Sequence, residues 1–354
     1  MLNFEHLQFQ KLAVHHVGNK SRGESVFASN QLHPLTDDEL EIALFNFFLT
    51  SFKTEDQYRF FHASHLNMNE MFVYAQKIFQ NPDDFLGVSK HILQHLFQQS
   101  DHPRIKAGEL YVVYFTDLVL DDELVDAIGI FKSESKNTFL QIHEGSGALR
   151  ITHYEGINTK KLDKGCLIFN TLEEDGYLVK TIDSLAKESE EAAFWKKDFL
   201  GIKPVEDSVY STKAYLQMTR NFVEEVAAPE LDLGRSEQLE MMQKSVTFFE
   251  ENSDFNIKEF AETVINEPAL NEQFIGYKQQ YEKDQQLKME DYFDISQATV
   301  KREKRKFKHQ ITLDNSIQIK LNPDHQERNN AVLERGFDEE KGLFFYKIHF
   351  EFES

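Results

Sequence analysis

Apolar residues recur every three to four positions in the first part of the chain, and this spacing predicts helices. Thr36 and Glu39 have the spacing of a capping box, so the first helix is expected to begin there. A second helix is predicted over 71–79, and Asn81 followed by Pro82 predicts the start of a third. The apolar positions expected to face the core are Leu40, Leu44, Phe47, Phe48 and Phe52, then Met71, Phe72, Ala75, Ile78 and Phe79, then Phe85, Val88, Ile92 and Leu96.

Short β-prone runs follow Pro103, separated by clusters of Asp, Asn, Gly and Ser, and this pattern predicts an antiparallel sheet or meander. Leu7–Val17 is expected to form the first strand, and a further helical stretch is predicted over 185–226. The predicted runs are Leu110–Phe115, Val125–Phe131, Phe139–His143, Cys166–Phe169 and Tyr177–Ile182.

Pro229–Ser236 is the best candidate for a linker, because proline and glycine interrupt two helical stretches there. We therefore expect an N-terminal domain over 1–228 and a C-terminal domain over 229–354, in which Ser236 and Asn256 cap helices. Near the end of the chain the apolar residues fall on alternate positions, which predicts two amphipathic strands, with a turn at Asp338–Gly342 before the second. The alternating positions are Ile311, Leu313, Ile317, Ile319 and Leu321, and then Phe344, Tyr346, Ile348, Phe350 and Phe352. The predicted fold class is α+β: a mixed N-terminal domain with an antiparallel sheet and helices, then a helical C-terminal region ending in a small antiparallel sheet.

Composition narrows the class of protein. The chain has 354 residues, 40% of them hydrophobic, and a formal net charge of −21, which argues against a protein that coats DNA through bulk charge. Cys166 is the one cysteine, so a disulfide framework and a zinc site of several cysteines are excluded. Neither a signal peptide nor an apolar stretch of membrane-spanning length is visible. We therefore expect a soluble cytoplasmic protein.

The sharpest charge shift lies at residue 301. Residues 221–300 hold 6 basic against 18 acidic residues, whereas 301–308 hold 6 basic against 1 acidic. Such a run can neutralise DNA phosphates, and Phe307 within it can stack on a base. If all six basic residues contacted phosphates, the logarithm of the DNA-binding constant would fall with the logarithm of the salt concentration with a slope of about −5. The alternative is a solvated run, or one paired with the acidic helices before it. The six candidate DNA-binding residues are Lys301, Arg302, Lys304, Arg305, Lys306 and Lys308.

Histidine pairs and the lone cysteine give little support for metal or nucleophilic chemistry. His62 with His65, and His91 with His95, have spacings that can place two imidazoles on one metal ion, but no third ligand accompanies them. Cys166 lies in an apolar strand-like segment, which favours a small buried hydrophobic residue over a nucleophile. No complete phosphate-binding glycine loop occurs, so we expect no cofactor, no metal and no catalytic residues.

Two Glu-x-Lys tripeptides keep a metal-dependent nuclease as an alternative. Such cores use an upstream acidic residue and the Glu to hold the ion, and the Lys to steady the attacked phosphate. The instances are Glu134-Ser135-Lys136 after Asp126, and Glu339-Glu340-Lys341 after Asp324. Both fall in predicted turns, which lack the rigid placement that a catalytic site needs.

The order of several segments carries a resemblance across most of the chain. They are Leu7–Val17, Gly108–Phe115, Leu124–Ile130, Glu191–Gly201, the basic stretch leading into Ile317–Leu321, and Phe344–Phe352. In order, spacing and total length they resemble the bacterial 37-kDa nucleoid-associated protein family. The resemblance implies association with the bacterial nucleoid and brings no established catalytic residues.

These observations favour a non-enzymatic nucleoid-associated protein, located in the cytoplasm with the nucleoid. We expect weak, sequence-independent DNA contact through the 301–308 run, while the acidic remainder binds protein partners such as a DNA-processing enzyme. Two alternatives stay open: an acidic interaction module that binds a DNA-handling enzyme without touching DNA, and a metal-dependent nuclease. No membrane contact is expected, and the oligomeric state is open, with a homodimer as one option.

Overall fold

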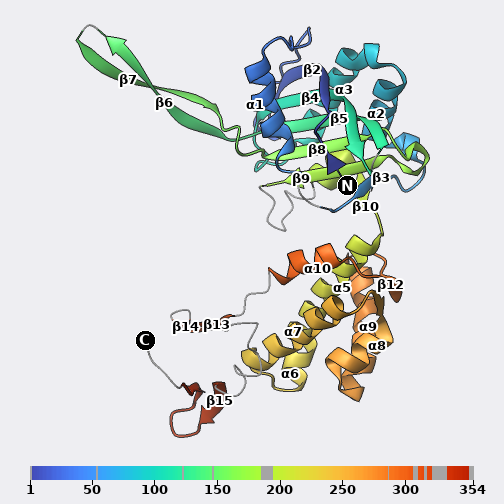
Figure 1. The fold of residues 1–354 in the computed structure, drawn as a ribbon, viewed down its shortest axis with the longest axis vertical. Helices are drawn as coiled ribbons and strands as arrows, with labels where there is room; N and C mark the ends of the chain where they lie inside the picture. Colours follow the sequence, from blue (N-terminus) through green and yellow to red (C-terminus); the bar gives the residue numbers. More distant parts are fainter. Residues whose placement is uncertain are drawn as a thin grey trace. The chain divides into compact units, whose positions relative to one another are not determined.

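The chain folds into two compact units, Met1–Val205 and Glu206–Ser354 (Figure 1). The computed structural model describes residues 2–52, 55–121, 123–145, 147–184, 194–285, 287–305, 310–314, 317–320 and 333–350. Helices and antiparallel sheets occur in both units, which confirms the α+β class. The division falls earlier than the boundary expected after residue 228, because Tyr215 and Phe222 already belong to the core of the second unit.

A large antiparallel sheet forms the centre of the first unit. Its order is β1-β4-β5-β8-β9-β3-β10, with β2 also paired to β4. The strands are β1 (Leu2–Asn3), β2 (Gln8–Val17), β3 (Tyr58–Phe60), β4 (Gly108–Leu120), β5 (Glu123–Ser133), β8 (Lys164–Phe169), β9 (Leu178–Asp183) and β10 (Ile202–Pro204). The β-prone runs at 110–115, 125–131 and 166–169 lie in β4, β5 and β8. The first predicted strand and the run at 177–182 match β2 and β9 except for their first residues, Leu7 and Tyr177, so these predictions are confirmed.

Both faces of this sheet are covered. Successive residues of β4 alternate between two cores: Leu110 and Val112 pack in one, and Tyr111 and Val113 in the other. The first core contains residues of α2 (Glu70–Gln80) and α3 (Phe85–Gln99), and the second contains residues of α1 (Asp38–Leu49). The sheet therefore has a hydrophobic layer on each side, and its strands read as nearly continuous apolar runs.

The helices of the first unit begin close to the predicted positions. The side chain of Asp37, one residue after Thr36, caps α1 by accepting a hydrogen bond from the Leu40 amide. After Asn81, a 3-10 turn (Pro82–Asp84) precedes α3, and the Asn81 side chain makes no capping hydrogen bond. The three predicted helices are confirmed, but the cap of the first and the start of the third are shifted.

A long hairpin leaves the sheet between β5 and β8. It consists of β6 (Lys136–Gly145) and β7 (Ala148–Ile157), which pair only with each other among the described residues and extend away from the sheet in Figure 1. The predicted run at 139–143 lies in β6, whereas β7 was not predicted.

The predicted helical stretch 185–226 is wrong in its middle. Residues 185–193 lie outside the described part of the chain, and a π-helical turn, η5, covers Phe194–Leu200. Gly201 then takes a left-handed conformation with φ of +62°, and Ile202–Pro204 pairs with β3 as strand β10. The helix resumes only at α5 (Ser208–Phe222).

The second unit is a helical assembly around an aromatic core. Phe255 lies at its centre, with ring centroids 4.2 Å from Tyr215, 5.3 Å from Phe249 and 4.8 Å from Phe293. The remaining elements are η6 (Val223–Ala227), α6 (Ala228–Glu230), α7 (Arg235–Glu251), β11 (Asp254–Asn256) paired with β12 (Tyr292–Asp294), α8 (Ile257–Phe260), η7 (Ala261–Ile265), α9 (Pro268–Gln285) and α10 (Gln297–Lys304).

Of the two predicted caps, one is correct. The Asn256 side chain accepts hydrogen bonds from the amides of Lys258 and Glu259, which confirms it as the N-cap of α8. Ser236 is not a cap, because α7 begins one residue earlier, at Arg235, after Gly234. Helical structure also continues to Glu230, so the expected linker is only the short break before Gly234.

Two hairpins close the described chain: β13 (Gln310–Leu313) with β14 (Ile317–Lys320), and β15 (Leu333–Asp338) with β16 (Leu343–Ile348). The predicted turn at Asp338–Gly342 is confirmed, since the Gly342 amide donates to the Asp338 carbonyl at 2.8 Å. Leu333 and Ile311 form a small core with Leu239 of α7. None of the helices in the described ranges has the length and apolar character needed to cross a membrane.

Candidate functional site

The described part of the basic run forms the end of helix α10. Ser296 caps this helix by accepting a hydrogen bond from the Thr299 amide. Thr299, Val300 and Glu303 are buried, so this face of the helix packs inward, against α5 and α7. Positive residues at the C-terminal end of a helix interact favourably with its macrodipole, which stabilises a cationic helix end here.

The basic residues of the run differ in their surroundings. Lys304 donates to both carboxylate oxygens of Glu250, at 2.9 and 3.1 Å, and the Arg302 Nε lies 3.6 Å from the Glu303 carboxylate. Lys301 and Arg305 are exposed and form no ion pair with any described residue. Lys306, Phe307 and Lys308 lie outside the described residues.

The alternative of internal pairing therefore holds for Lys304, whose ammonium is already occupied by a carboxylate of α7. Both partners of that pair are about one-third exposed, so solvent weakens their attraction and the contact can exchange. Lys301 and Arg305 are four residues apart, which places them on the same side of α10. The charge available to a polyanion in the described part of the run is concentrated on these two side chains.

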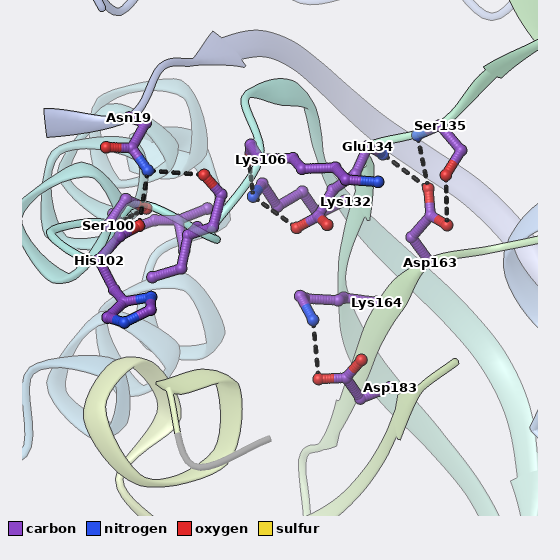
Figure 2. A network of polar contacts seen from close by, with 12 residues as sticks. Asn19, Ser100, His102, Lys106, Lys132, Glu134, Ser135, Asp163, Lys164 and Asp183 are labelled. Atoms are coloured by element: carbon purple, nitrogen blue, oxygen red, sulfur yellow. Dashed lines mark hydrogen bonds and ion pairs between the residues drawn. The ribbon is translucent and has the colours of Figure 1, made fainter. Parts of the chain in front are cut away.

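A second charged cluster is buried in the first unit, at the ends of three neighbouring strands (Figure 2). Lys132 on β5 pairs in register with Lys164 on β8, which in turn pairs with Asp183 on β9. The Lys132 Nζ donates to the Glu134 carboxylate at 2.7 Å and to the Lys106 carbonyl at 2.6 Å. The Lys164 Nζ donates to the Asp183 carboxylate at 2.8 Å.

Burial is the largest influence on the pKa of Lys132. Its side chain is 0% exposed and that of Glu134 is 4% exposed. Removal from water lowers the pKa of Lys132, and the nearby Glu134 carboxylate opposes this effect. A pair this deeply buried loses much of its Coulomb attraction to desolvation, but removing one partner would leave an uncompensated charge in the core. We therefore expect that removing either partner alone would destabilise the first unit more than the intact pair stabilises it.

Asp163 completes this cluster and holds the chain where β5 gives way to β6. Its carboxylate accepts hydrogen bonds from the amides of Glu134 and Ser135, at 2.7 and 2.9 Å, and from the Ser135 hydroxyl at 3.1 Å. Figure 2 shows this carboxylate directed at the junction. Because the charges are paired and the carboxylate is enclosed by donors, the cluster serves as an anchor for the β6–β7 hairpin.

The geometry does not favour a nuclease at either Glu-x-Lys tripeptide. Asp126 and Glu134 are eight residues apart along one extended segment, roughly 26 Å at the rise of a β-strand, so they cannot share an ion. The Asp126 carboxylate instead accepts a hydrogen bond from the Tyr114 hydroxyl at 2.5 Å. Lys341 pairs with Asp338 in the predicted turn, and Asp324 lies outside the described residues. Within the described ranges, no group of three or more His, Cys, Asp or Glu residues is arranged to hold a metal ion.

The histidine pairs have structural roles. The Nδ1 atoms of His62 and His65 accept hydrogen bonds from backbone amides two residues ahead, which stabilises local turns. A ring nitrogen of His95 lies 2.9 Å from the Phe199 carbonyl oxygen. Cys166 is completely buried, and burial raises the pKa of its thiol far above the usual value, so it remains a protonated core residue as predicted.

Sequence reasoning missed the buried cluster at Lys132, Asp163, Lys164 and Asp183. One signal was present: Lys132 directly follows the apolar run Val125–Phe131, and Lys164 directly precedes the run that begins at Cys166. Charged residues at the ends of apolar strands usually reach solvent, so burial of these could be recognised only once the pairing of β5, β8 and β9 was known.

The two-unit α+β fold, the cationic helix end and the fully paired buried cluster define a protein without a recognisable catalytic centre among the described residues. A family model described as nucleoid-associated protein YejK matches residues 13–339, nearly the whole chain. The chain therefore belongs to this family of nucleoid-associated proteins, which is not a family of enzymes. A comparison with curated proteins finds no match.

Proposed function

We propose that this nucleoid-associated protein contacts DNA directly, weakly and without sequence preference, through the basic run 301–308. Its acidic surface would bind protein partners such as DNA-processing enzymes, and the protein would act in the cytoplasm, with the nucleoid. Contacts from Lys and Arg to phosphates give affinity and orientation but carry no base information, which is why we expect no sequence preference.

Exposure of Lys301 and Arg305 supports this proposal more than any other observation. Both side chains reach solvent at the end of α10, and neither pairs with a carboxylate in the described part of the chain. The screening length is about 8 Å at physiological ionic strength, so DNA that contacts these residues is influenced mainly by nearby charges. The net charge of −21 limits the affinity without abolishing local contact.

The pairing of Lys304 with Glu250 lowers the expected salt dependence. Phosphate contacts from Lys301 and Arg305 alone would give the logarithm of the DNA-binding constant a slope of about −2 against the logarithm of the salt concentration. Contacts from Lys306 and Lys308 in addition would make this slope about −4. We therefore expect a shallower slope than the value of about −5 for six contacts.

The same ion pair is the observation that favours a second candidate. If Arg302 and Lys304 stay engaged with carboxylates, the acidic surface alone could occupy a basic groove on a DNA-handling enzyme. This candidate predicts no binding of bare DNA at moderate salt.

Duplex DNA binding by a Lys301→Ala/Arg305→Ala variant tests the first proposal. We expect fluorescence anisotropy with a labelled duplex to show at least tenfold weaker binding than the parent at low salt, and a salt slope reduced by about 2. Helix α10 should persist, because both side chains are exposed and alanine favours helices.

A matched control removes two positive charges elsewhere in the same unit. Lys244 and Lys258 are exposed on α7 and α8, so Lys244→Ala/Lys258→Ala changes the net charge equally. The control should bind DNA almost as the parent does. Equal weakening by both variants would show bulk charge rather than a site, and absence of any DNA binding by the parent would leave the partner-only candidate.

A further inference from the structure

Two strands at one edge of the large sheet carry a pair of positive residues without a carboxylate partner. Arg59 of β3 lies directly opposite Lys203 of β10 in the antiparallel register, so both side chains project from the same face. Neither side chain forms an ion pair with any residue that the structure describes. Like charges directly opposite each other destabilise a sheet, so this pair needs an explanation other than stability.

The guanidinium group of Arg59 is also incompletely bonded. Its Nε is buried and has no hydrogen-bond partner in the described part of the chain. A buried donor without an acceptor is costly, and more so when it is charged, because it has lost its contacts with water. An anion bound between the two strands would supply the missing acceptor and offset the repulsion between Arg59 and Lys203.

The opposite face of the same two strands packs in the interior. Phe60 belongs to the first hydrophobic core, and Tyr58 and Ile202 pack against it. Among the described residues, the second core contains none from β3 or β10. The face that carries Arg59 and Lys203 is therefore not used for hydrophobic packing.

Polar contacts of the backbone hold this part of the sheet in place. The buried Asn69 side chain donates to the Phe61 carbonyl at 3.2 Å and to the Gly201 carbonyl at 2.9 Å, and the Phe61 amide donates to the Gly201 carbonyl at 2.9 Å. The Lys203 Nζ lies 4.4 Å from the centroid of the Phe61 ring, which is 46% exposed. This cation–π contact places an exposed aromatic ring beside the two positive charges.

We propose that Arg59 and Lys203 bind the phosphate of a nucleotide, and that its base packs against the exposed part of the Phe61 ring. The planar guanidinium fork matches the geometry of phosphate oxygens, and the ammonium adds a point charge on a flexible stem. An aromatic ring beside these charges suits a base, because every base has a flat face that can stack. A free nucleotide and a single-stranded nucleic acid offer this same chemistry. The inference does not depend on the DNA contact proposed for residues 301–308.

Fluorescence anisotropy of ADP labelled with a methylanthraniloyl group tests the site in the full chain. We expect the parent to bind the labelled ADP, and Arg59→Met to bind it at least tenfold more weakly, because methionine keeps the length of the side chain without the guanidinium. Lys196→Met is the matched control. The Lys196 Nζ donates to the Tyr58 hydroxyl at 2.8 Å, on the opposite face of β3, so this variant loses the same charge and should bind within about twofold of the parent.

Competition against the labelled ADP identifies the source of the nucleotide. Displacement by unlabelled ADP alone would assign the site to a free nucleotide, and stronger displacement by an oligothymidylate would assign it to a single strand. Phe61→Leu should weaken binding of the labelled ADP by about fivefold or more, because it removes the stacking surface. Equal displacement by inorganic phosphate and by ADP would overturn the assignment to a nucleotide.

Unfolding in urea gives a second measurement, which a purely structural role of Arg59 would not reproduce. Without ligand, Arg59→Met should be at least as stable as the parent, because it removes the unpaired buried donor and the repulsion from Lys203. Addition of ADP should raise the urea midpoint of the parent and leave that of Arg59→Met unchanged. A parent that does not bind labelled ADP, equal binding by Arg59→Met, or a loss of stability in ligand-free Arg59→Met would overturn the proposal.

Discussion

His15 shows how one buried side chain connects several elements of the first unit. It lies on β2, only 2% exposed, and its Nδ1 accepts a hydrogen bond from the Ser29 amide at 3.1 Å. Its Nε2 lies 3.0 Å from the Ser89 hydroxyl of α3. An accepting Nδ1 requires the neutral imidazole, with the proton on Nε2 directed at Ser89. Burial, and secondarily the charge of Lys90, lowers the pKa of His15 to about 4.

This arrangement predicts that the first unit loses stability in mild acid. The folded-state pKa lies below the ordinary value of 6.5, so the unfolded chain binds more protons between pH 6.5 and 4. Stability due to the neutral ring is therefore present above pH 6.5 and is lost as the pH falls through that window. Urea unfolding should show about 2 kcal/mol less stability attributable to His15 at pH 5 than at pH 7.

The His15→Gln variant isolates this contribution. Glutamine keeps an amide donor for Ser89 but does not titrate, so its stability should depend less steeply on pH between 7 and 5. Comparing the change in stability between the two pH values removes the difference in baseline stability between the variant and the parent. Equal slopes for parent and variant would show that the His15 proton does not contribute.

At the scale of single elements, the base of the β6–β7 hairpin depends on one carboxylate. Asp163→Ala leaves the Glu134 and Ser135 amides without their acceptor in a partly buried position. Each amide left without an acceptor costs about 1–3 kcal/mol, so we expect the free energy of unfolding of the first unit to fall by roughly 2–6 kcal/mol in urea experiments. A loosened base should also expose the hairpin, and trypsin should cleave after Arg150 faster than in the parent.

Ser135→Ala is the control for this prediction. It removes one of the three hydrogen bonds to Asp163 and leaves both amides bound to the carboxylate. We expect the free energy of unfolding to fall by less than about 1 kcal/mol, and trypsin to cleave after Arg150 at the same rate as in the parent. If both variants behaved alike, the backbone contacts of Asp163 would not be what holds the junction.

The elements that the sequence predicted best are those whose signal is local. Asn256 caps α8 because its side chain reaches amides only two and three residues ahead. The cap of α1 was placed one residue too early, because Thr36 and Asp37 are both suitable and only the geometry selects Asp37. Strands β4 and β5 were found because both of their faces are buried, which produces long apolar runs.

The elements that sequence reasoning missed depend on contacts between distant residues. Strand β10 is three residues long and exists because it pairs with β3, far away in the sequence. Strand β7 exposes Leu149 and Ile151 to solvent. Its alternating apolar residues therefore do not face a core, and the strand was not predicted. For the basic run, composition identified the charges, but only the fold shows that Glu250 of α7 engages Lys304.

At the scale of the whole molecule, the two units have separate hydrophobic cores. The first unit packs its helices on both faces of the sheet, and the second packs around the Phe255 ring cluster. Trp195, the chain's one tryptophan, is fully buried in the first unit and donates a hydrogen bond to the Thr181 hydroxyl at 3.0 Å. Tryptophan fluorescence therefore reports unfolding of the first unit, whereas the helical circular dichroism signal includes both.

These separate cores predict that the units unfold independently. Phe255→Ala removes the ring at the centre of the second core and should destabilise that unit by about 3–5 kcal/mol. The circular dichroism transition in urea should then begin at lower denaturant, while the midpoint reported by Trp195 stays that of the parent. Phe131→Ala, which removes a ring stacked 4.3 Å from Phe48 in the first unit, should shift the fluorescence midpoint instead. An equal shift of both signals by Phe255→Ala would mean that the units unfold as one, and that each core depends on the other for its stability.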